Sequence, residues 1–197
     1  MLKTALTQAI IQRAVKLARD RRGMVLQETA IILPILILLM LGGYDIARFA
    51  FLQQKLSRMV MSTSDMVAQG ATISIPEIDT IFSASSTMVQ PFPAGSSQIM
   101  IVSSVSKTGN AAPKVDWQRS GGGTLAGQTS KLGAAAANAT LPSGFLVRAG
   151  ENAIVTEIYY KFTPVFLPDL ILPTTLYHRA IYRPRQSSLT TLCAALC

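Results

Sequence analysis

RRGMVLQETAIILPILILLMLGGYDIARF, residues 21–49, decides the fold of this chain, because it joins a basic segment to a long apolar run through one glycine. The apolar run covers residues 24–44, and its strongly polar side chains, Gln27, Glu28 and Thr29, all lie near its start. At 1.5 Å per residue the run makes about 32 Å of helix, which is enough to cross a bilayer core of about 30 Å. The stretch therefore predicts one membrane-spanning helix.

The positive charge of the chain lies mostly in front of this run. The formal net charge is +8, and residues 1–23 account for +5 of it, with six basic residues and one acidic residue. Because the cytoplasmic flank of a membrane helix carries the excess of Lys and Arg, residues 1–23 are expected to be a cytoplasmic leader, with the C-terminal portion outside. The sequence has no Lys/Arg stripe interleaved with aromatic residues, so nucleic-acid binding is not expected.

The helical pattern continues past the apolar run, which argues against a removable secretory signal. Such a signal has an apolar core of about 7–15 residues followed by a small-residue cleavage site, whereas this run is longer and ends in GGYDIAR. Residues 24–70 are therefore expected to form a transmembrane helix that continues as an amphipathic stem and stops at Gly70. The apolar residues at helical spacing in the stem are Phe49, Phe51, Leu52, Leu56, Met59, Val60 and Met66.

The junction between leader and apolar run carries a motif. Gly23 follows two arginines, and Glu28 is the fifth residue after it. This arrangement resembles the class III signal of type IV pilins and pseudopilins, and in closer detail the N-terminus of TadE-like pseudopilins of the tight-adherence (Flp, type IVc) pilus system. The family commonly has Phe after the glutamate, where this chain has Thr29. The positions that carry the resemblance are Arg22, Gly23, Glu28, Ala30, Leu33, Pro34, Gly42, Asp45 and Arg48.

The resemblance implies a function in pilus assembly. A prepilin peptidase would cut after Gly23 and leave Met24 as a new N-terminus, which is also expected to be methylated. Since the major pilins of the system are much smaller, the chain would be a minor pseudopilin. It would be a protein without enzymatic activity that assists assembly, initiation or capping of the pilus, in a system that serves cell adhesion and is related to secretion.

The resemblance also implies partners and a location. The partners would be the major pilin, another pseudopilin, the prepilin peptidase and the inner-membrane platform protein. The location would be the bacterial inner membrane, crossed once, with the N-terminus cytoplasmic and the C-terminal domain periplasmic. A position at the pilus tip, along its shaft or only in the membrane stays open. The main rival is an unprocessed bitopic anchor that holds a binding or scaffold domain in the periplasm.

Physical chemistry gives the motif residues their roles. A carboxylate in an apolar helix needs a cation, and after cleavage the α-amino group of Met24, in the same or a neighbouring chain, would supply one to Glu28. Such a pair would set the register of insertion, as buried polar groups do in coiled coils. The alternative is that Glu28 lies near the headgroups, where it is solvated. Pro34 removes one backbone hydrogen bond and is expected to kink or loosen the helix.

Asp45 and Arg48 lie three residues apart just past the apolar run, so they can pair on one helix face. The favoured interpretation is an exposed ion pair within the helix, because exposed pairs are the commoner case. The alternative is a contact between subunits.

Residues 71–185 are expected to form a small periplasmic α+β domain in which an antiparallel sheet packs on the stem helix, and the resemblance implies that this domain is pilin-like. The apolar, proline-punctuated segment 164–173 is expected to be either a lid over the sheet or a sticky surface for a partner. In the tail, residues 186–197, Cys193 and Cys197 are spaced to pair on a helical turn or with other chains. The expected elements are a helix at 75–90, strands at 97–107, 114–119, 152–163 and 175–183, a flexible loop at 120–133, and one or two helical turns at 134–139.

The sequence gives little support for a catalytic site or a cofactor-binding site. With one histidine, His178, there is no zinc-binding spacing, and the glycine-rich segment lacks the pattern of a phosphate-binding loop. We therefore expect no cofactor, no metal and no small-molecule substrate. A membrane-tethered enzyme is the remaining alternative, with His178 and Asp169 as its candidate residues.

Overall fold

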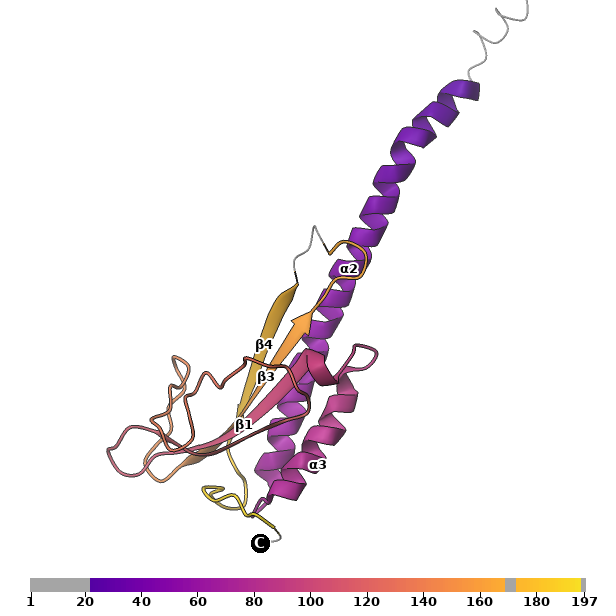
Figure 1. Ribbon diagram of the computed structural model, residues 1–197. Coiled ribbons are helices and arrows are strands. Elements are labelled where there is room, and N and C mark those ends of the chain that lie inside the picture. The colour runs from indigo at the N-terminus through magenta and orange to yellow at the C-terminus, as the bar shows by residue number, and fades with distance from the viewer. Residues whose placement is uncertain (1–21, 169–172, 196–197) are drawn as a thin grey trace, which may run out of the picture. The chain divides into compact units, whose positions relative to one another are not determined.

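The computed structural model describes residues 22–168 and 173–195 (Figure 1). The chain divides into two compact units, Met1–Tyr44 and Asp45–Cys197. The helices are α2 (Arg22–Gln69) and α3 (Ile75–Ser86), followed by the 3₁₀ turns η1 (Thr87–Val89) and η2 (Gly95–Ser97). The strands are β1 (Gln98–Ser106), β2 (Lys114–Gly121), β3 (Asn152–Phe162) and β4 (Thr174–Tyr182).

The first unit contributes the apolar part of α2. Every side chain from residue 23 to residue 40 is exposed, and the helix is long and apolar enough to cross a membrane, with a mean hydropathy of 2.3 in its most apolar window. Such a surface is stable only where lipid or other apolar groups surround it. The predicted long N-terminal apolar helix is confirmed.

In the second unit, α2 changes to an amphipathic helix. Its inward side chains recur every three or four residues and are fully buried, which is the spacing of one helix face against a core. The helix ends at Gln69, one residue before the predicted stop at Gly70. The buried apolar side chains of this part are Leu52, Leu56, Met59, Val60, Val67 and Ala68.

The sheet has the order β2-β1-β3-β4, and all its neighbouring strands are antiparallel. All four predicted strands and the predicted helix near residue 75 are present within a few residues of their expected bounds. The α+β class is therefore confirmed. Helix α3 starts with a capping box in which the Glu77 carboxylate accepts from the backbone N–H and the hydroxyl of Ser74, both at 2.8 Å.

The main core lies between the sheet, α2 and α3. Alternate residues of β3 face this core, and Thr156 is the polar exception in the row. The Ser64 hydroxyl on α2 donates to the Thr156 hydroxyl at 3.0 Å, so the polar pair is satisfied inside the core. The β3 side chains in the core are Ile154, Ile158, Tyr160 and Phe162.

The connection between β2 and β3 corrects two sequence predictions. Residues 134–139 form no helix, because Ala136 and Ala137 instead exchange backbone hydrogen bonds with Val115 at the edge of β2. Residues 120–133 do not form a free loop either. A Cβ at Gly123 would lie 2.0 Å from the Gln98 carbonyl oxygen, so this glycine serves close backbone packing.

The same connection covers the sheet face that points away from α2. It contributes Leu132 and Val147 to a second, smaller apolar cluster with Val105, Val115, Ala153 and Val155. The central strand β3 is therefore buried on both faces, which explains why ten of its 11 residues are buried.

Candidate functional site

The predicted processing site lies at the start of the described helix. A Cβ at Gly23 would meet nothing within 4 Å, and Met24 is 64 % exposed. The backbone here is therefore not shielded by the described part of the chain. Residues 1–21 of the predicted leader lie outside the described residues.

Glu28 is exposed on the apolar helix, and none of the ion pairs between described residues includes it. The Met24 nitrogen precedes it by four residues, about 6 Å of helical rise, so the two positions share one face. The neighbouring Thr29 hydroxyl donates to the Val25 carbonyl oxygen at 2.8 Å and so satisfies itself within the helix. Glu28 is thus a carboxylate in this segment that no described ion pair neutralises.

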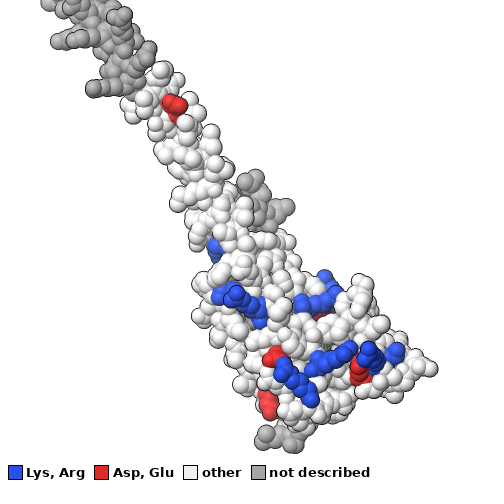
Figure 2. Space-filling model, turned by 180° about the vertical axis from the view of Figure 1, so that it is seen from behind, with Lys and Arg blue, Asp and Glu red and all other residues white. Residues whose placement is uncertain are grey.

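The rest of the segment is uncharged up to residue 44. Figure 2 shows it as white apart from one acidic group, whereas Lys and Arg side chains are spread over the surface of the Asp45–Cys197 unit. Pro34 lies inside α2, where it lacks the N–H that would bond to the preceding turn. Gly43 has open space where a Cβ would stand.

Asp45 has the opposite surroundings, since its side chain is fully buried. Its carboxylate accepts three backbone N–H groups from the segment after β3: Val165 at 3.0 Å, Phe166 at 3.0 Å and Leu167 at 3.1 Å. Burial alone raises the pKa of Asp45, but the three N–H donors and the nearby Arg48 outweigh it, and the net pKa lies below 3.8. The carboxylate is therefore ionised at neutral pH and binds the segment firmly.

The prediction of an exposed Asp45–Arg48 ion pair is wrong. The two groups are 4.0 Å apart, but Asp45 is not exposed at all and the Arg48 side chain is only 23 % exposed. The Arg48 guanidinium also lies over the Phe92 ring, 5.3 Å from its centroid. Sequence spacing identified the pair but could not identify the backbone amides, which come from 120 residues further along the chain.

Comparison with known families concerns this same part of the chain. Residues 23–64 match the model of the TadE-like protein family. Over this segment the chain is TadE-like. The match confirms the resemblance inferred from the sequence, and it contains Gly23, Glu28, Asp45 and Arg48. No curated protein and no solved structure matches the chain.

Outside the TadE-like segment, the predicted lid or sticky surface at 164–173 is partly described. Residues 165–167 are bonded to Asp45, while the side chains of Val165 and Phe166 are exposed. Asp169, the acidic candidate of the enzyme alternative, lies outside the described residues.

The cysteine tail is attached to the start of α3. The Ile75 N–H donates to the Cys193 carbonyl oxygen at 2.9 Å, and the Cys193 N–H donates to the Ile73 carbonyl oxygen at 3.1 Å. Cys193 is disulfide-bonded. Cys197 lies outside the described residues, so the pairing of the two cysteines stays a prediction.

Glu157 is a buried carboxylate that the sequence analysis missed. It accepts from the Ser130 hydroxyl, from the Lys131 N–H at 3.1 Å and from the Tyr177 hydroxyl at 2.7 Å. Burial and then the bond to Glu157 raise the pKa of Tyr177. Glu157 therefore fastens the β2–β3 connection to the sheet. An acidic residue in the middle of a mainly apolar strand was the available signal.

His178, which lies outside the TadE-like segment, is held in a structural environment. Its Nε2 atom is hydrogen-bonded to the Gln53 side-chain oxygen on α2, and burial lowers its pKa. The bond joins β4 to the stem helix. No nucleophile or second titratable group is bonded to it among the described residues.

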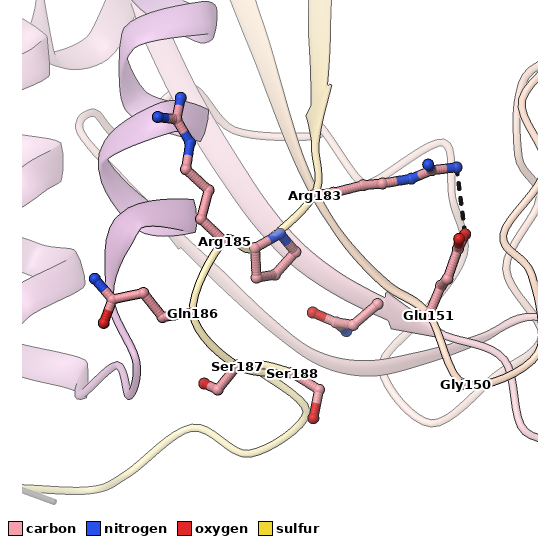
Figure 3. Close-up of a pocket in the computed structure, with 9 residues that line it drawn as sticks. Gly150, Glu151, Arg183, Arg185, Gln186, Ser187 and Ser188 are labelled. Atoms are coloured by element: carbon pink, nitrogen blue, oxygen red, sulfur yellow. Dashed lines mark ion pairs between the residues drawn. The ribbon is translucent and has the colours of Figure 1, made fainter.

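A surface cavity of about 270 Å³ lies where β4 ends, and Figure 3 shows its lining. Its arginines are already paired: Arg183 with Glu151 at 3.3 Å, and Arg185 with Asp65 at 2.8 Å. Within residues 22–168 and 173–195, no three His, Cys, Asp or Glu side chains are grouped as metal ligands. The cavity therefore adds no group that is arranged for catalysis.

Proposed function

We propose that this chain is a minor pseudopilin of a tight-adherence pilus, made as a prepilin and cut after Gly23 by a prepilin peptidase. The observation that carries the proposal is the TadE-like match over residues 23–64. It includes an exposed glycine at the predicted cut and an exposed glutamate four residues after the new N-terminus. TadE-like proteins of pilus systems are structural proteins, which fits an assembly role.

Cleavage would create the charge that Glu28 lacks. Removal of the leader leaves Met24 with a free α-amino group, one helical turn from the Glu28 carboxylate. In an assembly of such helices in lipid, an amine of a neighbouring chain would pair with Glu28, and a chain inserted at another height would leave both charges unpaired. The pair would thereby select one register.

The two units have different surfaces, which suit different roles. The apolar side chains from residue 24 to residue 40 are exposed and available to lipid or to other helices. The Asp45–Cys197 unit has its own hydrophobic core, and its buried carboxylates accept hydrogen bonds from groups of the same unit. We propose that the first unit anchors the chain in the inner membrane and enters the assembly. The second unit would stand in the periplasm and meet the major pilin, another pseudopilin or the platform protein.

The test is the N-terminus of the protein recovered from its native host, measured by intact-mass spectrometry. The proposal expects an N-terminus at Met24, methylated or not. Gly23→Val should block the cut, because a branched side chain obstructs the backbone that the peptidase must hold. Gly43→Val is the matched control, since Gly43 lies on the same helix and also has open space around its Cβ position.

An intact leader in cells with active peptidase would contradict the proposal and support the unprocessed bitopic anchor. Location is a separate measurement. Recovery of the protein with sheared pili would place it in the fibre, whereas retention in the envelope would indicate a role in initiation from the membrane.

A further inference from the structure

The turn after β3, residues 163–168, presents two large apolar side chains to the surroundings. Val165 is 55 % exposed and Phe166 is 46 % exposed. Pro164 between Thr163 and Val165 is buried, so the turn is seated on the unit and directs its next two side chains outwards. Two adjacent exposed apolar residues of this size require an explanation, because water solvates them poorly.

The turn is fixed at one place on the unit. The carboxylate of Asp45 accepts the N–H groups of Val165, Phe166 and Leu167 at 3.0 to 3.1 Å. Three charge-assisted bonds to consecutive residues leave the turn little freedom. The exposure of the two side chains is therefore built into the fold.

That place is next to the end of the apolar run. Asp45 directly follows Tyr44, the last residue of the run. The turn is bonded to Asp45 itself, which is the residue that follows the run. If residues 24–44 cross the bilayer, the helix leaves the hydrocarbon at about this level.

The charges near the turn suit a phospholipid surface. Lys161, the second-to-last residue of β3, is exposed, and the Arg48 side chain is partly exposed. The described carboxylate beside the turn, Asp45, is fully buried beneath it. Apolar side chains with basic neighbours are the combination that favours the headgroup region of a bilayer containing anionic lipid.

We propose that Val165 and Phe166 contact the bilayer surface, so that the unit is held to the membrane at a second point besides the helix. The occupant of this surface is the phospholipid headgroup and upper acyl region, and Asp45 is the residue that positions the turn for it. The proposal rests on the membrane anchoring of residues 24–44. The contact would hold the periplasmic unit in one orientation until the chain leaves the membrane.

The strand β3 supplies a matched control position. It runs antiparallel to α2, since the Phe162 ring packs on Phe49 at 5.3 Å while Thr156 is bonded to Ser64. Leu146, 79 % exposed, precedes the start of β3, whereas the turn follows its end. The first and last residues of β3 are ten residue steps apart, which corresponds to about 33 Å of strand.

The experiment uses the full chain in vesicles of phosphatidylethanolamine and phosphatidylglycerol, with and without bromine on the acyl chains. Bromine quenches tryptophan within contact range. The variants are F166W, V165W and L146W, and the wild type supplies the baseline from Trp117, which is only 7 % exposed. We expect F166W and V165W to lose on the order of twofold more emission than L146W, because interfacial side chains enter the acyl boundary.

Flotation separates the failures. If all variants float with the vesicles but F166W and V165W are quenched no more than L146W, the lipid contact is wrong while the anchor stands. That outcome would favour a protein partner over lipid as the occupant of the turn. If the wild type does not float, the anchor fails, and the lipid contact fails with it.

Discussion

Glu28 and Asp45 are carboxylates on the same helix, and their surroundings are opposite. Glu28 is exposed among apolar side chains, and no described ion pair includes it. Asp45 is fully buried and accepts three backbone N–H groups of its own chain. The first has no described ion-pair partner, whereas the second is used within the fold.

The apolar side chains on either side of residue 44 show the same contrast. Those of residues 24–40 are exposed, whereas Leu52, Leu56 and Met59 on the same helix are fully buried. Hydropathy alone does not separate the two groups. The difference teaches that one continuous helix can be an exposed apolar segment in one part and a core element in the other, and that the surroundings of each carboxylate depend on the part in which it lies.

The largest expected effect is that of Glu28→Gln on assembly. Removing one member of a buried ion pair costs about 3–5 kcal/mol, so recovery of sheared pili should fall by about a hundredfold to a few thousandfold. The unfolding of the Asp45–Cys197 unit should not change, since Glu28 is bonded to nothing in it. Circular dichroism of the full chain in detergent checks this. Wild-type pilus recovery would instead indicate that Glu28 is solvated at the headgroups.

Asp45→Ala should lower the stability of the Asp45–Cys197 unit, which Glu28→Gln is expected to leave unchanged. It leaves the N–H groups of Val165, Phe166 and Leu167 without their acceptor, and we expect a loss of about 2–4 kcal/mol in the free energy of unfolding. Hydrogen exchange of these three amides should accelerate. The measurements are chemical denaturation and hydrogen-exchange mass spectrometry of the full chain in detergent.

Asp79→Ala is the control for that experiment. Asp79 pairs with Arg119 at 2.8 Å, but both side chains are exposed, at 48 % and 39 %. An exposed pair contributes less than about 1 kcal/mol. Equal losses in the two variants would show that burial of Asp45 is not what makes its bonds strong.

The smallest expected effect is the change in the free energy of unfolding as the pH is lowered. Because the folded state lowers the pKa of Asp45 below 3.8, its stabilisation is fully present above that value and is lost as the pH falls from 3.8 through the lowered pKa. Asp45→Asn should remove this part of the acid dependence. Denaturation midpoints of wild type and variant, measured from neutral pH downwards, should converge in acid. Parallel curves would contradict the role assigned to the Asp45 charge.

The strands were predictable because each alternates or is bounded by turn residues over a short distance. Asn152–Phe162 shows this, since the strand expected at 152–163 is present and alternate residues along it lie in the main core. The helix expected at 134–139 failed because local propensity favours a helix in an alanine run, while the edge of β2 offers backbone partners. Such partners depend on which segments meet, which local propensity does not contain.

The sequence by itself determined the apolar helix, its continuation as a stem, the α+β class and the Gly23–Glu28 motif, because these depend on periodicity, length and the order of residues. Only the tertiary structure decided that Asp45 is buried under the turn after β3, that Glu157 fastens the β2–β3 connection, and that Gly123 serves close packing. The physical reason is that backbone amides are present at every residue. Which of them reach a carboxylate depends on how distant segments fold together.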